Sequence, residues 1–172
     1  MKPFEGQTAV VTGASRGIGR AIARKLAREL DGVYLRIDSI EQAIRDSDAA
    51  GGPLNDVGYR VGYSVAEDNL CLGRLVIADS VNPVQFTRDG WIGVAGRTGA
   101  RAIEVEIICS DLQQHRWRVE TRMADIAGLR LPTWPEVAGR DYQPWERERI
   151  VIDTAGKSLV ESVMELRRVL AM

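Results

Sequence analysis

Short β-rich runs alternate with longer helical stretches along the chain, and this alternation is what most constrains its fold. The strand candidates are residues 8–12, 33–37, 74–79, 103–109 and 149–153. Between the first two, residues 18–30 carry Ile22, Leu26 and Leu30 at helical spacing. Strands separated by helices are typical of a parallel sheet covered on both faces. We therefore expect an α/β fold: a three-layer α/β/α sandwich with a five-stranded parallel sheet.

Length and charge narrow the classes of function. The 172 residues predict a single domain, and 23 basic against 24 acidic side chains give a net charge of −1, which argues against a nucleic-acid partner. Apolar runs stay shorter than the roughly 18 residues of a membrane span. The start, MKPFEGQ, lacks a signal-peptide pattern, which predicts a cytoplasmic protein without a membrane partner. The single histidine, His115, excludes a metal site with several histidine ligands.

A glycine-rich loop, TGASRGIG over residues 12–19, joins the first strand candidate to the first helix. Glycines permit tight turning, and the N–H groups at a helix start point at an anion such as phosphate. Residues 1–27 resemble the first β-loop-α unit of the short-chain dehydrogenase/reductase family, a Rossmann fold. The resemblance implies NAD(P) binding by the loop, and Arg16 would favour NADP. The candidate cofactor-binding residues are Gly13, Ser15, Arg16, Gly17, Ile18, Gly19 and Arg20.

Beyond residue 27 this resemblance ends. None of the four tyrosines is followed by a lysine four positions on, as the Tyr-x-x-x-Lys pair of that family requires. Residues 28–172 instead resemble small P-loop kinases of the AAA-like kind, relatives of shikimate, gluconate and chloramphenicol kinases. Segments such as GRLVIADSVNP and RIVIDTAGKSLVESVMELR carry this similarity. It implies ATP and Mg²⁺ as ligands, and a lid at about residues 112–148, where prolines and glycines interrupt the pattern.

The kinase pattern is incomplete at its most important point. Such a kinase carries GxxxxGK[ST] after its first strand, in which the lysine binds the β- and γ-phosphates and the hydroxyl binds Mg²⁺. With the first glycine on Gly13, the expected Gly-Lys-Ser/Thr falls on Ile18, Gly19 and Arg20. We therefore expect weak or absent phosphotransfer. The two resemblances together predict a chimera of engineered origin, with its seam near residue 27.

Two aspartates follow strand candidates. Asp38, after the second strand, can be the carboxylate near an acceptor hydroxyl, a ribose-binding residue, or simply a helix N-cap. Asp79, after the third strand, resembles the Walker-B carboxylate that reaches Mg²⁺, with a solvated strand end as the alternative. Both residues are candidates for catalytic roles, and Asp79 is also the candidate metal ligand.

Arginines at the base of the expected lid complete the candidate site. Arg118 and Arg122 are four residues apart, so a helix over residues 111–125 would place them on one face. In related kinases such arginines bind the ATP phosphates, and Arg116 and Arg130 are nearby candidates. A solvated helix face, with Glu120 and Asp125 as ion-pair partners, is the alternative. Three tryptophans near the lid can pack it or stack on a base: Trp117, Trp134 and Trp145.

Three functional hypotheses remain open from the sequence. The first is a nucleotide- or phosphate-binding domain on a small-molecule kinase scaffold, with ATP/Mg²⁺, phosphate or sulfate as ligand. The second is an NAD(P)-binding domain without dehydrogenase activity, in which Asp38 or Arg36 lies near the ribose. The third is a folded chimera without a ligand. Calorimetry with NAD, NADP, ADP and ATP would separate them.

Overall fold

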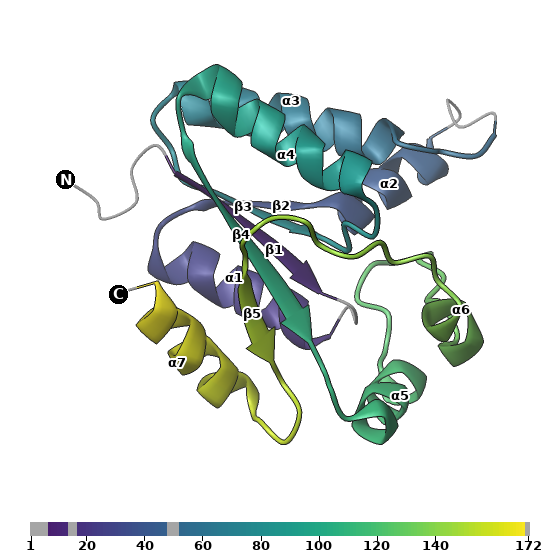
Figure 1. Ribbon diagram of the computed structural model, residues 1–172. Helices are drawn as coiled ribbons and strands as arrows, with labels where there is room; N and C mark the ends of the chain where they lie inside the picture. Colours follow the sequence, from purple (N-terminus) through teal and green to yellow (C-terminus); the bar gives the residue numbers. More distant parts are fainter. Residues whose placement is uncertain (1–6, 14–16, 48–51, 171–172) are drawn as a thin grey trace.

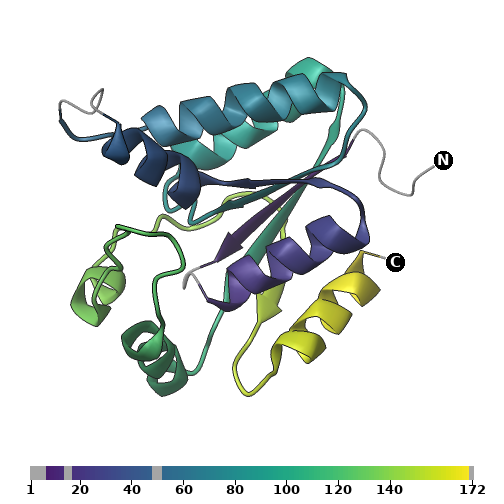
Figure 2. The same cartoon turned by 180° about the vertical axis from the view of Figure 1, so that it is seen from behind.

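The computed structural model describes residues 7–13, 17–47 and 52–170, and side chains from residue 17 onward within these ranges (Figures 1 and 2). The strands are β1 (Gln7–Gly13), β2 (Val33–Arg36), β3 (Val76–Ser80), β4 (Arg101–Ile108) and β5 (Ile150–Asp153). The helices are α1 (Ile18–Glu29), α2 (Ile37–Asp46), α3 (Val57–Cys71), α4 (Gln85–Thr98), α5 (Leu112–Thr121), α6 (Trp134–Ala138) and α7 (Leu159–Val169). The α/β class predicted from the alternating pattern is confirmed.

The strands are parallel and follow the order β2-β3-β1-β4-β5. β1 therefore lies between β3 and β4, whereas in the Rossmann dinucleotide-binding fold it lies beside β2. Any Rossmann character of residues 1–27 is thus confined to the local unit and does not extend to the sheet. Because the strands are parallel, their carboxyl ends meet at one edge.

Alternating residues of the central strands separate two apolar cores. On one face, Leu75 and Ile77 pack with Ile22 and Leu26 of α1 and with Leu166 of α7. The opposite core is formed by residues of β3 and of the helices α2, α3 and α4, including Val76, Ala78, Trp91 and Val94. Figures 1 and 2 show α1 and α7 together on one side of the sheet and α3 and α4 on the other.

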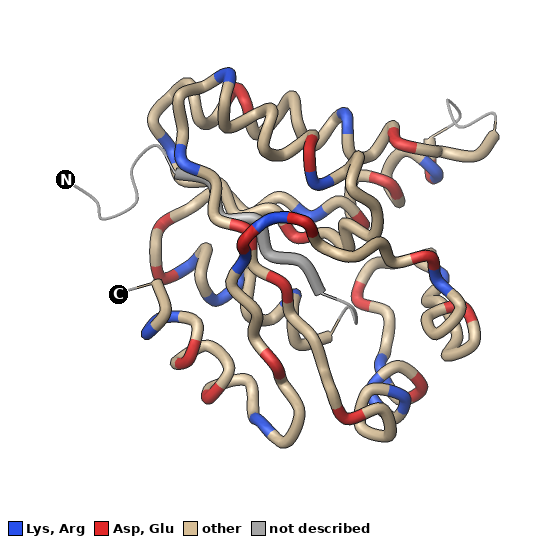
Figure 3. Tube along the Cα trace, in the orientation of Figure 1, with Lys and Arg blue, Asp and Glu red and all other residues tan. Residues whose placement is uncertain are grey.

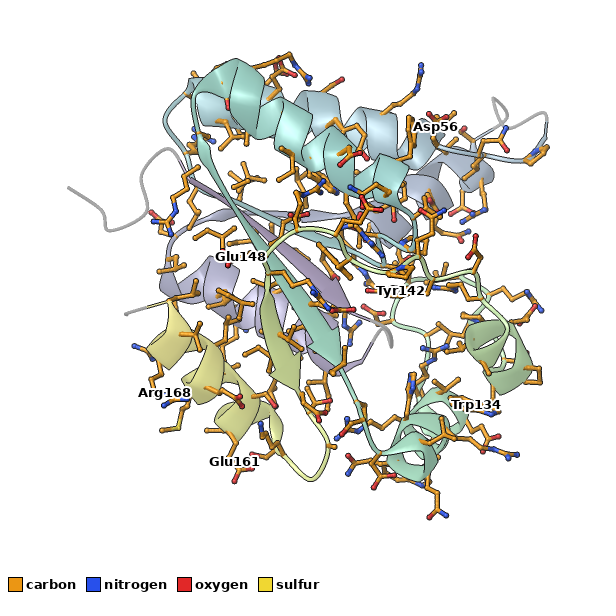
Figure 4. The ribbon with its side chains drawn as sticks, viewed as in Figure 1. Asp56, Trp134, Tyr142, Glu148, Glu161 and Arg168 are labelled. Carbon is orange, nitrogen blue, oxygen red and sulfur yellow. The ribbon has the colours of Figure 1, made fainter. Side chains whose placement is uncertain are left out.

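A charged segment, residues 142–149 (the strap), passes over β4. Glu104 and Glu106 alternate with residues of the first core, so they face the side of α3 and α4. Arg147 binds Glu104 through two hydrogen bonds of 2.9 and 3.0 Å, and Arg149 binds Glu106 at 2.6 Å. Tyr142, labelled in Figure 4, also donates to Glu106 at 2.9 Å. Figure 3 shows basic and acidic residues alternating where the strap approaches β5. Ion pairs with the strap therefore cover the two glutamates on this face of β4.

The region predicted as an irregular lid is more ordered than its composition indicates. α5 ends at Thr121, four residues earlier than predicted, and residues 122–133 (the lid loop) follow. The helix α6 was not predicted; its first turn is closed by hydrogen bonds between Thr133 and Glu136. Within the described ranges, no helix is long and apolar enough to cross a membrane.

Candidate functional site

The described residues of the glycine loop belong to the end of β1 and to the start of α1. Gly13 is the last residue of β1, and Gly17 precedes α1 without a side-chain cap. Ile18, Gly19 and Arg20 form the first turn of that helix. The free N–H groups of a helix start favour an anion there. Ser15 and Arg16, also predicted to bind the cofactor, lie outside the described residues.

Arg20 reaches from α1 to the lid loop. Its guanidinium forms an ion pair with the carboxylate of Asp125. The side chain is 24% exposed, and its Nε is buried, with no hydrogen-bond partner in the described part of the chain. A cation therefore stands at the position where the kinase pattern places the Mg²⁺-binding hydroxyl.

Arg36, the last residue of β2, binds the same carboxylate. Its two terminal nitrogens donate to Asp125 at 2.8 and 3.1 Å, and one of them lies 3.6 Å from Asp38. The Arg36 side chain is only 8% exposed, whereas that of Asp125 is 37% exposed. The hydrogen bond from Arg36 lowers the pKa of Asp125, which keeps this carboxylate charged. We call Arg20, Arg36, Asp38 and Asp125 the edge cluster.

Asp79 lies next to this cluster, at the penultimate position of β3. The hydroxyl of Tyr34 donates to its Oδ2 at 2.6 Å. Burial is the main cause that raises the pKa of Asp79 to about 6. A carboxylate that is buried, hydrogen-bonded and easily protonated is a weak ligand for a divalent cation, and the Arg20 and Arg36 charges also act on it. These residues fit Mg²⁺ poorly, and the role of Asp79 as a magnesium ligand stays a prediction.

Asp38 lies two positions further into its helix than an N-cap role would place it. α2 starts at Ile37 and its N-cap is Arg36, so the predicted N-cap role of Asp38 is wrong. Its carboxylate lies in the first turn, where the helix dipole favours a negative charge. The strand predicted to run to residue 37 ends at Arg36, because the backbone already turns into α2 there.

A pocket of about 350 Å³ opens beside Asp38. Carboxylates of Asp38, Glu41 and Asp56 face it, and Arg140 is its basic lining residue among those described. Ser80, the last residue of β3, also lines it. The remaining lining residues are largely apolar: Ile37, Asn55, Tyr59, Val81, Pro83, Val84, Phe86 and Thr87. The pocket therefore combines an apolar wall with acidic groups.

The lid arginines are not arranged as predicted. Arg122 is the C-cap of α5 with an extended backbone, so it does not share a helical face with Arg118. Arg118 instead donates to the hydroxyl and the carbonyl of Thr154, at 2.8 and 3.0 Å, and Arg122 donates to the Pro132 carbonyl at 2.9 Å.

The two nearby candidates form ion pairs within the lid region. Arg116 pairs with Glu120 within α5, and Arg130 pairs with Glu136 of α6. Any role of these residues at phosphate stays a prediction.

The tryptophans near the lid differ from one another. Trp134 packs edge-on against the half-buried His115, with ring centroids 5.2 Å apart. The guanidinium of Arg88 lies over the ring of Trp145 in the strap, and its carbon Cζ is 4.2 Å from the centroid of that ring. Trp117 is 64% exposed. Packing thus accounts for two of the three.

Two residues that bind the side chains of the candidate site were not predicted from the sequence in this role. Tyr34 was not singled out, and Asp125 was expected beside Arg118 and Arg122 rather than between Arg20 and Arg36. Asp125 is 89 positions from Arg36 in the sequence, so no local spacing relates them. Only the fold brings the lid loop to the end of β2.

The sequence matches no family model and no curated protein. Solved structures do match. The APS kinase CysC of Mycobacterium tuberculosis, in complex with AMPPNP and APS, shares 20% identity over 99% of this chain and 100% of its own, with a TM-score of 0.64. A gluconokinase from Sinorhizobium meliloti shares 16% over 98% and 97%, with a TM-score of 0.62. Kti12 of Chaetomium thermophilum, in complex with ADP-AlF3, shares 17% over 94% and 97%, with a TM-score of 0.65. The chain therefore has a P-loop kinase-like α/β fold.

Proposed function

We propose that this protein binds a nucleotide or another phosphate-bearing small molecule at the carboxyl edge of its sheet, with weak or absent phosphotransfer. The observation that carries the proposal is the convergence of Arg20 and Arg36 on one carboxylate beside the start of α1. Two guanidiniums and a free helix start form a binding site for an anion. Two of the similar structures, solved with AMPPNP and with ADP-AlF3, support a nucleotide as the ligand.

The loss of phosphotransfer follows from the side chains at the loop. The lysine that contacts the β- and γ-phosphates is replaced by Gly19, and the Mg²⁺-binding hydroxyl by Arg20. Asp38 and Asp79 would then be vestiges of the acceptor carboxylate and the Walker-B residue. Neither compensates for the missing lysine, because neither is a cation.

Calorimetry with ATP, ADP, NAD and NADP tests the proposal directly. We expect heat of binding with ATP or ADP and no ATP turnover above that of buffer. A triple variant, Ile18→Gly, Gly19→Lys and Arg20→Ser, restores the kinase pattern and should gain ATP affinity in the presence of Mg²⁺. Absence of binding by every nucleotide would contradict the proposal, and turnover at ordinary kinase rates by the natural chain would contradict the lost catalysis.

NAD(P) binding is the second candidate, and the TGASRGIG loop favours it. Asp38 lies next to Arg36 at the end of β2, near where a ribose would be held. Its negative charge is unfavourable for the extra phosphate of NADP, so NAD is the better test ligand. Heat with NAD and none with ATP would favour this candidate over the first.

We also infer that residues 1–27 were joined to a kinase-like body as a chimera of engineered origin. The burial of α1 supports this inference: Ile22, Ala23 and Leu26 are fully buried in the same core as α7. A transplanted helix that fills the core in this way can replace the original one without loss of the fold. If the chimera binds no ligand, the unfolding midpoint will not shift with any of the four nucleotides.

A further inference from the structure

We propose that Arg20 and Arg36 form a phosphate-binding site that Asp125 occupies in the free protein, and that a phosphate group replaces Asp125 without a divalent cation. The proposal deepens the proposed function, since it specifies how this edge of the sheet recognises its ligand.

The two arginines come from different elements and meet at one acid. Arg20 belongs to the first turn of α1, and Arg36 ends β2. Arg36 donates two parallel hydrogen bonds to the carboxylate, and Arg20 pairs with the same Oδ2 that accepts the shorter of them. Planar bidentate recognition of this kind serves a phosphate as well as a carboxylate.

Both arginines retain a buried donor that Asp125 does not satisfy. The Nε atoms of Arg20 and Arg36 are buried and have no hydrogen-bond partner among the described residues. An unsatisfied buried donor is unfavourable, so it marks a site that is incomplete with its present partner. A carboxylate offers two oxygens as acceptors, whereas a terminal phosphate offers three.

Asp125 is the member of the cluster that can leave. Its side chain is 37% exposed, and it belongs to the lid loop rather than to a helix or strand. Met123, two residues before it in the loop, is 88% exposed, whereas Leu129, four residues after it, is buried at 8% exposure. Arg36, in contrast, is fixed in the sheet with 8% exposure. Moving the acid into water therefore leaves a preformed pair of cations behind.

The charge of Arg20 works against a divalent cation at this site. Arg20 stands where the kinase pattern has a hydroxyl that binds Mg²⁺, and a guanidinium repels a nearby divalent cation. The guanidiniums themselves supply the positive charge that a phosphate needs. Two carboxylates stay beside them when Asp125 leaves: Asp79 accepts a hydrogen bond from Tyr34, and Asp38 lies 3.6 Å from Arg36.

The test compares the unmodified chain and three variants in calorimetry with inorganic pyrophosphate, first with EDTA and then with Mg²⁺. Asp125→Asn removes the competing charge at nearly constant shape. Glu120→Gln is the matched control, because it removes one carboxylate of an exposed ion pair on α5, which joins Glu120 to Arg116. Arg20→Gln combined with Asp125→Asn removes one of the two cations. Unfolding midpoints verify that each variant is folded.

We expect Asp125→Asn to bind pyrophosphate at least about fivefold more tightly than the natural chain in EDTA, the low end of typical coupling between two ligands. Glu120→Gln should bind like the natural chain, and the added Arg20→Gln should reverse the gain. Equal affinity of Asp125→Asn and the natural chain, or binding that requires Mg²⁺, would overturn the proposal.

A parallel titration with ATP separates this proposal from the proposed function. If the natural chain binds ATP and Asp125→Asn binds neither ligand more tightly, the site is elsewhere and the nucleotide-binding function stands. If no variant binds pyrophosphate or ATP, both proposals are wrong. If Asp125→Asn alone binds, Asp125 acts as an internal competitor and both are supported.

Discussion

The strap and the edge cluster are both built from arginines and carboxylates, but burial is distributed in opposite ways. In the strap the acids are buried: the side chains of Glu104 and Glu106 are 5% and 9% exposed, and Arg147 is 32% exposed. In the edge cluster the base is buried, with Arg36 at 8% and Asp125 at 37%. The group that can leave is therefore a base in the strap and an acid in the edge cluster.

This difference separates a structural network from a binding site. If a strap arginine leaves, a buried glutamate on β4 loses its partner, and solvent offers only small cations in return. If Asp125 leaves, the buried Arg36 loses its partner, and an anionic ligand is what could replace it. Arg88 shows a third arrangement: it is fully buried and donates to four backbone carbonyls, those of Asn82, Pro83, Gln143 and Pro144. Its bonds tie the strap to the turn after β3.

The largest effect is expected from breaking the strap. Arg147→Met leaves Glu104 buried without its cation and should lower the free energy of unfolding by about 3 kcal/mol, the low end for a broken buried pair because Arg147 is partly exposed. Urea denaturation measures the change.

Adding Glu104→Leu to this variant should recover most of the loss, since an apolar pair of similar volume avoids the desolvation cost. Arg116→Met, which breaks the surface pair with Glu120, is the control and should change stability by less than about 0.5 kcal/mol. If the strap does not stabilise the fold, Arg147→Met will change the free energy of unfolding as little as this control does.

Asp79 is a buried acid with a raised pKa, so the free energy of unfolding should depend on pH in the opposite direction to that expected for an acid in a surface ion pair. Its pKa rises from 3.8 to about 6 on folding, so the native state binds more protons between these values. Its contribution to stability is therefore greatest below about pH 4 and is lost as pH rises through 6, by up to about 3 kcal/mol.

Urea midpoints of the natural chain and of Asp79→Asn between pH 4 and pH 7 isolate this contribution. Asparagine cannot titrate, so the difference between the two proteins should change with pH in favour of the variant as pH rises. A constant difference would mean that the Asp79 pKa is ordinary. Tyr34→Phe, which removes the hydrogen bond to Asp79, should cost about 1–2 kcal/mol and serves as a companion variant.

The sequence predicts the layers of this fold well because they depend on local periodicity. Ile22 and Leu26 are buried at the predicted helical spacing. Boundaries shift by a few residues, as at β3, which extends to Ser80 rather than Asp79. The helix α6 was missed because its five residues are too few to show a period.

The candidate site was only half predictable. The loop glycines and the two aspartates lie at the carboxyl edge, where the rule for parallel sheets places a site. The partners of Arg20 and Arg36 could not be found, because an ion pair across 89 positions leaves no local pattern. The strap was unrecognised for the same reason: the pairing of residues 147 and 149 with β4 depends on the crossing of two distant segments.

Asp125→Asn, the variant expected to change phosphate binding most, is expected to change stability least. Asp125→Asn should change the free energy of unfolding by no more than about 1 kcal/mol, because its carboxylate is more than a third exposed and water replaces the lost contacts. Urea denaturation at pH 7 measures this, beside Arg147→Met as the large-effect reference. A loss as large as that of the strap variant would show that Asp125 is a structural anchor for Arg36, and the contrast between the two networks would disappear. A small loss means that the edge cluster holds its acid weakly enough for a ligand to replace it.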